Sequence, residues 1–340
     1  MEPNVKKNDL PLHVFLVSNP IVAMVSYEYI HEMSLKKDDI LIIFFRDFYV
    51  NLFSEMNIRI CNRSILQKLG DRLSVSDINT RTSNKDIFEK IGDHFSVTKL
   101  SSRSVKRKLI ESYNRQFILY TSWLDETASE VVESKDCRGH VYIEEGDMSY
   151  QEHPIFPLSI DYCRQSKRIV GKNEFFTDFW RNDALLWVGV TKNSFPTAPD
   201  SKKYKIRSFL NVKKKYNPVL QEYKNILLMP SPARLPESEW KNSVSKLASN
   251  ENQPFALKLH PRMIGRNPLV FKYFENVLHE LGFSEAIVCS KETIIEIEMM
   301  YDKKKLVGDR SSLSRYADLV GSDFEEVPFL YGEFYGHKRE

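Results

Sequence analysis

The chain has 340 residues, of which 42% are hydrophobic and 28% charged. This composition can bury large cores and excludes an intrinsically disordered chain, and the length suits two domains of ordinary size. The formal net charge is only +3. With no recognised binding module in the chain, this mild charge argues against a nucleic acid partner.

The positive residues are clustered rather than spread. The dense stretches are 103–108 (RSVKRK), 202–207 (KKYKIR) and 213–215 (KKK). Such clusters can meet phosphates, anionic lipid or an acidic substrate. For each of them a solvated helix face or a linker is the more common explanation.

Cysteine usage and hydropathy indicate the compartment. Four cysteines are far apart and form no CxxC pair: Cys61, Cys137, Cys163 and Cys289. This argues against a zinc site or a disulfide framework and favours a reducing compartment. The first apolar run, 13–18, comes too late and is too short for a signal peptide, and no run approaches the roughly 18 apolar residues of a membrane span. We expect a cytoplasmic protein, with peripheral contact at the inner membrane through the basic segments left open.

Short apolar runs in the first half of the chain predict strands. They lie at 13–18, 40–45, 58–61, 95–99, 117–121 and 140–144. Helical patterns separate these runs; one begins at Pro20, directly after Asn19, and runs to about Met33, and another covers 124–134. Proline suits the first turn of a helix, where its missing N–H has no intrahelical partner. Alternating strands and helices predict a doubly wound α/β domain.

The alternation of strands and helices is interrupted in the middle of the chain and then returns. Residues 185–190 form one more strand, and residues 201–224 are Lys-rich and read as a basic linker. Further strands are predicted at 225–229, 254–259, 286–289, 305–307 and 318–321, with helices at 237–248, 269–281 and 292–301. The sequence thus predicts two Rossmann-like α/β domains, 1–200 and 225–340, facing each other across a cleft that holds the site.

An acidic turn follows the strand at 140–144. Glu144 and Glu145 are adjacent carboxylates and Gly146 comes next. Adjacent strand residues point to opposite faces, so the two carboxylates should divide their roles. A carboxylate with apolar neighbours can have its pKa raised, as a general base requires. Taken alone, an ordinary acidic turn with Gly at a positive φ explains the stretch better.

A histidine ends an apolar strand in the second domain. His260 precedes Pro261, which restricts it to extended conformations and orients the imidazole, and this suits a fixed donor to a phosphate. A loop histidine with no role is at least as common. The same dipeptide occurs at His153-Pro154, so it is weak evidence by itself, but His153 does not follow an apolar strand.

Two serines open a helix near the end of the chain. Ser311 and Ser312 follow the strand at 305–307, and hydroxyls with backbone N–H groups at a helix N-terminus can bind a nucleotide phosphate. Simple N-capping is the alternative. Three further residues are candidates to contact the nucleotide: Glu296 at the ribose diol, and Ser231 and Pro232 in the first strand-to-helix loop of the second domain.

Several signatures do not occur in the sequence. There is no Walker A loop, GxGxxG, HExxH or GxSxG motif. The acidic pair Asp38-Asp39 lies at the start of a strand, where a metal-dependent transferase does not hold its metal. We therefore expect a metal-independent mechanism with no cofactor.

Glu144-Glu145-Gly146, His260-Pro261 and Ser311-Ser312, in this order and setting, resemble the motifs of bacterial sialyltransferases with a GT-B fold. The stretch 179–196 (FWRNDALLWVGVTKNSFP) is also similar to the capsule and lipooligosaccharide members. The resemblance covers about a dozen residues strongly and the rest of the chain diffusely.

The resemblance implies an inverting, metal-independent transfer of sialic acid from CMP-sialic acid to a glycan acceptor. One of Glu144 and Glu145 would be the general base, and the resemblance favours Glu144. His260 would assist departure of CMP, and Ser311 and Ser312 would hold its phosphate. A single phosphate can be balanced by one His and two hydroxyls, where a diphosphate would favour a metal. The first domain would then bind the acceptor and the second the nucleotide sugar.

Two other functions remain open at this point. A transferase using another CMP-linked sugar, such as CMP-Kdo, would need the same base, His and hydroxyls. A glycan-binding protein of GT-B shape without turnover is the second. The intact Glu, His and Ser groups argue against the second, because a decayed enzyme should have lost at least one of them.

Overall fold

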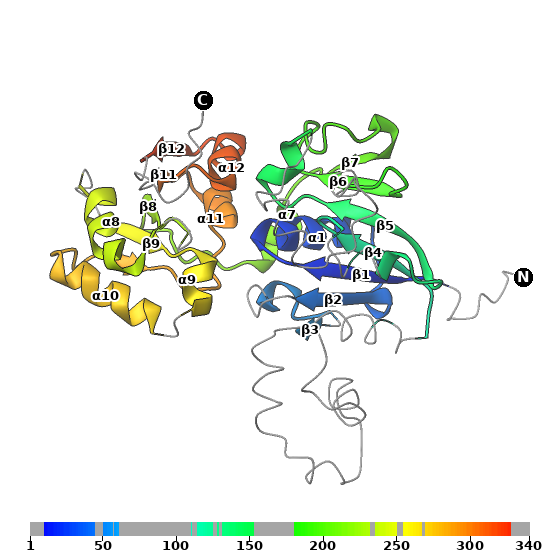
Figure 1. Cartoon of the computed structure of the whole chain (residues 1–340), viewed down its shortest axis with the longest axis horizontal. Helices are drawn as coiled ribbons and strands as arrows, with labels where there is room; N and C mark the ends of the chain where they lie inside the picture. The colour runs from blue at the N-terminus through cyan, green and yellow to red at the C-terminus, as the bar shows by residue number, and fades with distance from the viewer. Residues whose placement is uncertain are drawn as a thin grey trace, which may run out of the picture. The chain divides into compact units, whose positions relative to one another are not determined.

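The computed structural model divides the chain into two compact units, Met1–Val212 and Lys213–Glu340 (Figure 1). It describes residues 10–44, 50–56, 58–60, 110, 114–124, 128, 131–152, 180–231, 235–249, 254–266 and 269–327. The predicted strand at 95–99, the cluster 103–108 and Pro232 lie outside these residues, and the predicted helix at 124–134 lies only partly within them.

Unit 1 is built on a sheet of seven described strands, all parallel, in the order β3-β2-β1-β4-β5-β6-β7. The strands are β1 (Leu12–Val17), β2 (Ile40–Phe44), β3 (Ile58–Ile60), β4 (Phe117–Thr121), β5 (Cys137–Ile143), β6 (Leu186–Gly189) and β7 (Lys203–Lys205). Strand order reverses between β1 and β4. In open α/β sheets, ligands bind outside the carboxyl ends of the strands at such a switch point.

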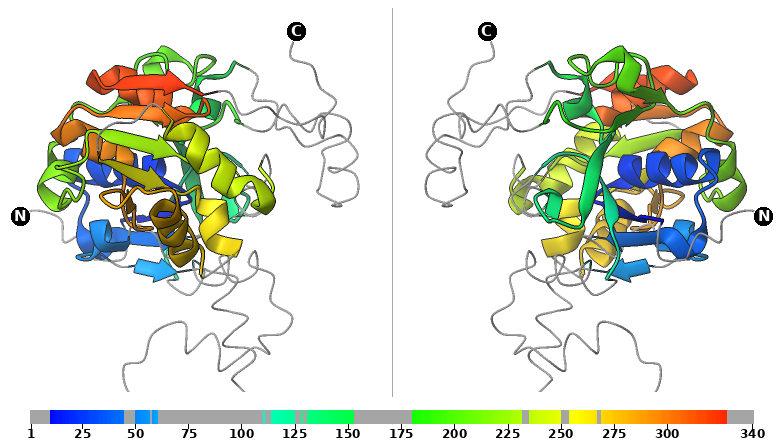
Figure 2. Two further views of the ribbon diagram at one scale, coloured as in Figure 1. Left: turned by 90° about the vertical axis from the view of Figure 1, so that its left-hand side faces the viewer. Right: turned by 90° about the vertical axis from the view of Figure 1, so that its right-hand side faces the viewer.

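Helix α1 (Pro20–Glu32) lies against this sheet, where it contacts β1, β5 and β6 (Figures 1 and 2). Pro20 occupies its first turn, and the Asn19 side chain accepts a hydrogen bond of 2.9 Å from the Val22 N–H. All residues from Ile21 to Ile30 are buried, and the polar Ser26 and Glu28 are among them. The helix predicted to start at Pro20 is confirmed.

Unit 2 has a sheet of five described strands, again all parallel, in the order β10-β9-β8-β11-β12. The strands are β8 (Asn225–Leu228), β9 (Phe255–Lys258), β10 (Ile287–Val288), β11 (Lys305–Gly308) and β12 (Asp323–Glu326). Its switch point lies between β8 and β11. The predicted α/β class with two Rossmann-like sheets is confirmed.

Helices cover both faces of the second sheet (Figure 1). The described helices are α8 (Trp240–Leu247), α9 (Pro261–Arg266), α10 (Val270–Glu280), α11 (Ile295–Tyr301) and α12 (Ser312–Val320). Helices α8 and α10 bury their apolar faces in one core with Leu227, Leu257 and Val307 of the strands. Helices α11 and α12 contact each other on the other side of the sheet.

The predicted last strand, 318–321, is wrong. Residues 318–320 end α12, and Gly321 terminates the helix in the left-handed conformation at φ 70 and ψ 30. Glycine adopts this conformation without the steric cost that a Cβ brings, which makes it a frequent helix terminator. The strand follows the glycine, as β12.

The stretch predicted as a basic linker, 201–224, is folded in part onto each unit. In unit 1, β7 pairs with β6, and the buried carboxylate of Glu28 in α1 accepts hydrogen bonds of 3.1 and 2.9 Å from the Asn211 and Val212 N–H groups. In unit 2, the carboxylate of Glu298 in α11 accepts a hydrogen bond of 3.1 Å from the Leu220 N–H. The division between units falls after Val212, inside the short helix α7 (Leu210–Lys215).

Of the helices described, none combines the length and the apolar character needed to cross a bilayer.

Candidate functional site

The two acidic residues of the EEG turn follow β5 at the carboxyl edge of the unit 1 sheet. Because β5 pairs with β4, and β4 with β1, the turn lies beside the switch point of the sheet. Gly146 has φ 122, a conformation that side chains rarely adopt. The turn then enters the short helix η4 (Asp147–Tyr150), which returns Ser149 and Tyr150 toward the carboxylates.

Glu144 is fully buried and its carboxylate is surrounded by donors. One oxygen accepts from the Tyr150 hydroxyl at 2.9 Å. The other accepts from the Val190 N–H at 2.7 Å and from the Ser194 hydroxyl at 2.6 Å. A buried carboxylate with three such donors is stabilised in place. Glu144 therefore ties the end of β5 to the loop that follows β6.

Glu145 has a different environment. Its N–H donates to the Ser149 hydroxyl at 3.0 Å, and its carboxylate accepts a long hydrogen bond of 3.4 Å from the Asn19 amide. Burial is the main reason that the pKa of Glu145 is raised to about 7, and the negative charge of Asp147 adds to it. A carboxyl that titrates near neutral pH at a strand's carboxyl end has the acidity of a general base.

Asn19 holds Glu145 from the first strand-to-helix turn. The Asn19 amide nitrogen also donates to the Glu145 backbone carbonyl at 3.0 Å, while its oxygen caps α1 at Val22. From the sequence, Asn19 was placed only directly before the helix that begins at Pro20 and was given no role in the site. The signal that could have found it is its position, since it directly follows β1 at the switch point.

Three adjacent strands of unit 2 bring the remaining predicted residues to one carboxyl edge. Strand β8 pairs with β9 on one side and β11 on the other. Ser231 follows β8, His260 follows β9, and Ser311 follows β11. Ser231, His260 and Ser311 therefore share the edge at the switch point of this sheet, where open α/β sheets bind ligands.

The imidazole of His260 is oriented by the start of α9. Its Nδ1 lies 3.1 Å from the Arg262 nitrogen and accepts that N–H. An acceptor Nδ1 places the proton of a neutral imidazole on Nε2. His260 is half-buried, and it presents the tautomer that can donate from Nε2 to an anion.

Ser311 occupies the N-cap position of α12, with φ −150 and ψ 178. Within the described part of the chain, its side chain makes no capping hydrogen bond to the helix. Its backbone carbonyl instead accepts from the Ser314 hydroxyl at 2.7 Å. The Ser311 hydroxyl therefore does not act as a simple N-cap. Ser312 is the first residue of the helix.

Glu296 lies in the first turn of α11 and is 5% exposed. Burial raises the pKa of Glu296, while the charge of Lys258 acts in the opposite direction. Ser231, at the end of β8, is half-buried.

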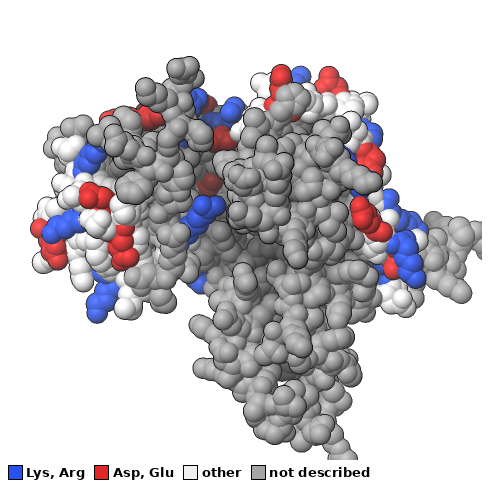
Figure 3. Space-filling view, viewed as in Figure 1, with Lys and Arg blue, Asp and Glu red and all other residues white. Residues whose placement is uncertain are grey.

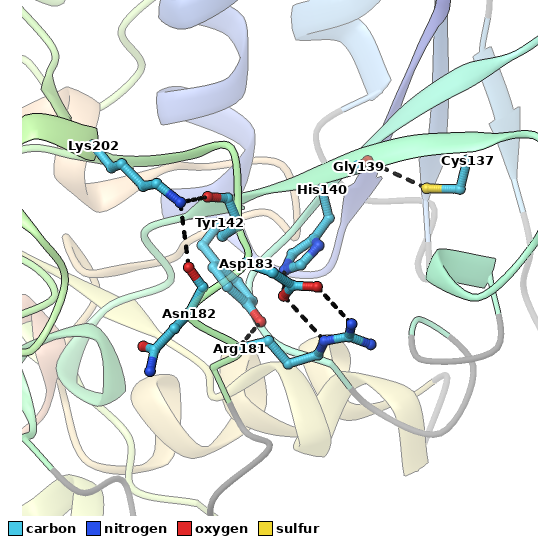
Figure 4. A network of polar contacts seen from close by, with 9 residues as sticks. Cys137, Gly139, His140, Tyr142, Arg181, Asn182, Asp183 and Lys202 are labelled. Carbon is cyan, nitrogen blue, oxygen red and sulfur yellow. Dashed lines mark hydrogen bonds and ion pairs between the residues drawn. The ribbon is translucent and has the colours of Figure 1, made fainter.

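A second polar network lies at the opposite, amino edge of the unit 1 sheet (Figure 4). Arg181 and Asp183 form a two-pronged ion pair, at 3.1 and 2.5 Å, in the loop before β6. The Lys202 ammonium donates to the Ala184 carbonyl at 2.8 Å. Burial lowers the pKa of His140 on β5. One lysine of the basic stretch is thus engaged in holding the loop.

On the face of Figure 3, the described Lys and Arg side chains lie among Asp and Glu. Among the described residues, no group of three or more His, Cys, Asp or Glu side chains could hold a metal ion.

No protein-family model matches the chain, and no curated protein matches it. Among solved structures, the chain is similar to UDP-GlcNAc 2-epimerase from Methanocaldococcus jannaschii, with 10% identity, a TM-score of 0.46, and 93% of this chain and 83% of that chain covered. It is also similar to UDP-GlcNAc 2-epimerase from Neisseria meningitidis bound to UDP-GlcNAc, with 13% identity, a TM-score of 0.42 and coverage of 93% and 81%. A third similar structure is the E. coli heptosyltransferase WaaC with ADP-2-deoxy-2-fluoro heptose, with 9% identity, a TM-score of 0.43 and coverage of 92% and 87%. At TM-scores below 0.5 these likenesses establish neither a shared fold nor a shared substrate.

Proposed function

We propose that the chain is a metal-independent, inverting sialyltransferase with a GT-B fold. It transfers sialic acid from CMP-sialic acid to a glycan hydroxyl in the synthesis of a bacterial surface polysaccharide or lipooligosaccharide. The single observation that carries the proposal is Glu145, whose carboxyl has a pKa of about 7 at the carboxyl edge of the unit 1 sheet. The motif resemblance supplies the donor.

Glu145, rather than Glu144, is the general base in this proposal. A base must accept a proton from the substrate, and the Glu144 carboxylate already accepts from Tyr150, Val190 and Ser194. The pKa of Glu145, raised to about 7, suits removal of a proton at neutral pH. Glu144 then supports the turn, which is the division of roles that strand alternation predicts.

The reaction proceeds as a displacement at the anomeric carbon. Glu145 takes the proton of the acceptor hydroxyl, the new C–O bond forms on one face, and the bond to the CMP oxygen breaks on the other. The Nε2–H of His260 donates to the departing phosphate, and Ser311 and Ser312 with the N-terminus of α12 bind it.

The test is a release assay. Purified chain is incubated with CMP-sialic acid and a panel of galactoside and sialoside acceptors, with no added metal, and free CMP is measured. Glu145→Gln should abolish release. The matched control is Glu152→Gln, an exposed carboxylate close by in the chain, which should leave release unchanged. Release by Glu145→Gln at the level of the native chain would contradict the assignment of the base.

A transferase of another CMP-linked sugar, such as CMP-Kdo, uses the same groups. Repeating the assay with CMP-Kdo separates the two, because only the correct donor gives acceptor-dependent release. Glycan binding without release from either donor would leave the non-catalytic alternative.

A further inference from the structure

We propose that Lys258 is a positioning residue for the nucleotide ribose. Its ammonium fixes the loop between β10 and α11, and this loop sets Glu296 against the 2′ and 3′ hydroxyls of the donor. The inference rests on the proposed function for the identity of the nucleotide. The role of Lys258 in the loop stands on contacts within unit 2 alone.

Lys258 leaves β9 on the same side of the sheet as His260. The alternate residues Phe255, Leu257 and Leu259 all lie in the core formed with α8 and α10. Because side chains alternate along an extended chain, Lys258 and His260 point to the other face. The Met229 N–H donates to the Lys258 carbonyl at 2.9 Å, so the strand pairing reaches this position.

On that face the Lys258 ammonium binds the backbone of the β10–α11 loop. It donates to the Thr293 carbonyl at 2.6 Å and to the Ser290 carbonyl at 3.3 Å. The loop is closed on itself, since the hydroxyls of Ser290 and Thr293 lie 3.1 Å apart and the Thr293 N–H donates to the Ser290 carbonyl at 3.3 Å. One ammonium thus gathers both carbonyls of a tight turn, and hydrogen bonds to a charged donor are stronger than neutral ones.

This turn determines where α11 begins, and Glu296 is the second residue of the helix. Within the described residues, the N-cap residue Ile294 provides no side-chain cap. The start of the helix is held instead by Lys258 at Thr293 and by the Tyr216 hydroxyl, which accepts the Ile294 N–H at 3.1 Å. Lys258 and Glu296 also lie close enough for each charge to act on the other.

The chemistry of Glu296 suits two neighbouring hydroxyls. A carboxylate has two acceptor oxygens and can take one hydrogen bond from each hydroxyl of a ribose diol. Such a contact depends on precise placement of the side chain, and residue Glu296 is 5% exposed. Lys258 provides that placement by binding the backbone carbonyl of Thr293, which is three residues before Glu296.

The test compares two ligands that differ only in the diol. Affinities for CMP and for 2′,3′-dideoxy-CMP are measured by calorimetry on the full chain and on Lys258→Met, Lys258→Arg and Glu296→Gln. The native chain should prefer CMP. Lys258→Met and Glu296→Gln should each lose about tenfold in CMP affinity, the equivalent of one hydrogen bond to a charged group, and change little toward the dideoxy ligand. The double variant Lys258→Met/Glu296→Gln should lose no more CMP affinity than either single variant. Lys258→Arg should retain part of the affinity that Lys258→Met loses.

A purely structural lysine gives a different pattern. Equal weakening of both ligands by Lys258→Met, or additive losses in the double variant, would overturn the positioning role. A native chain that binds both ligands equally would overturn the ribose assignment. The matched control is Lys272→Met, an exposed lysine on α10, which should leave both affinities unchanged.

Hydrogen exchange provides a readout that needs no nucleotide. The amides of Thr293 and Ile294, bonded within the loop and to Tyr216, should exchange faster in Lys258→Met and at the native rate in Lys272→Met. Native exchange in Lys258→Met would overturn the loop contact. A native chain that binds neither ligand refutes the proposed donor, and the exchange result then decides the role of Lys258 in the loop by itself.

Discussion

The Asn19 side chain binds both the backbone carbonyl of Glu145, at 3.0 Å, and its carboxylate, at 3.4 Å, across 126 residues of sequence. The same side chain caps α1 through its oxygen. A single amide thus connects the first strand-to-helix turn to the acidic turn. The proposed base is held by an element that is itself rigid and buried, which is how a reactive group keeps its geometry.

The pH dependence of turnover should follow Glu145. Its pKa is raised to about 7, chiefly by burial, so the base is ionised above that pH and protonated below it. We expect kcat/KM to rise with pH through about 7 and then level off. A profile that is flat from pH 5 to 8 in a chain that turns over would show that Glu145 is not the titrating base.

The raised pKa of Glu145 also predicts how the free energy of unfolding depends on pH. A carboxyl whose folded pKa is raised, here from 4.5 to about 7, is neutral in both states below the unfolded value. Stability is lost as the pH rises from the unfolded value to the folded value, and the full penalty is present above the folded value. Glu145→Gln should therefore raise the free energy of unfolding by about 1–3 kcal/mol at pH 8 and change it little at pH 4. Urea denaturation at the two pH values measures the difference, and an equal effect at both would contradict the shift.

Glu144→Gln should have the opposite effect. The amide that replaces the carboxylate turns a donor toward the Val190 N–H or the Tyr150 hydroxyl, both of which now donate to Glu144. Leaving buried donors unpaired costs about 2–4 kcal/mol of stability. Urea denaturation of Glu144→Gln beside Glu152→Gln checks this. Stability equal to that of the control would show that the network is not essential.

Asn19 variants separate capping from positioning. Asn19→Ser keeps a capping oxygen but loses both hydrogen bonds to Glu145. The free energy of unfolding should therefore fall by about 1 kcal/mol, the usual contribution of such hydrogen bonds, with no cost from the cap, and kcat should fall as well. Asn19→Asp also keeps the cap and places a negative charge beside Glu145, which should raise the pKa of Glu145 and move the pH–rate profile to higher pH. An unmoved profile in Asn19→Asp would argue against the contact.

Ser311→Ala should weaken nucleotide binding without weakening the fold. The Ser311 hydroxyl makes no capping bond among the described residues, so the usual cost of losing a cap, about 1 kcal/mol, should not appear. Asn19→Ala, which removes a cap that is made together with both hydrogen bonds to Glu145, is the comparison and should show at least that cost. CMP affinity by calorimetry and stability in urea complete the test. A full capping cost in Ser311→Ala would favour the N-capping explanation.

His260→Ala should slow turnover by about a hundredfold, the usual effect of losing a donor to developing charge. The control is His279→Ala, an exposed histidine in the last turn of α10. Release of CMP under saturating donor measures both. Near-native turnover in His260→Ala would remove His260 from the mechanism.

Much of the fold was predictable because its signal is local. The runs 13–18, 40–45 and 117–121 are mostly apolar, and they contain the largely buried parallel strands β1, β2 and β4. Strand β7 was missed because it is three residues long and reads Lys-Tyr-Lys with no buried position. Only its pairing with β6 makes it a strand. The strand wrongly predicted at 318–321 also has a local cause. The sequence shows apolar residues before Gly321 but does not show that they form the last turn of a helix.

The site divides in the same way. From the sequence alone, the acidic turn, the His-Pro strand end and the serine pair could be located, because residue type and strand position are enough to place them at carboxyl edges. The sequence could not assign the roles of Glu144 and Glu145, since neighbours on one strand share the same local signal. Only the tertiary structure separates them. Donors from Val190 and Ser194, far along the chain, surround Glu144. Burial and the negative charge of Asp147 instead raise the pKa of Glu145 to about 7, because a carboxyl's acidity is set by what the fold packs around it.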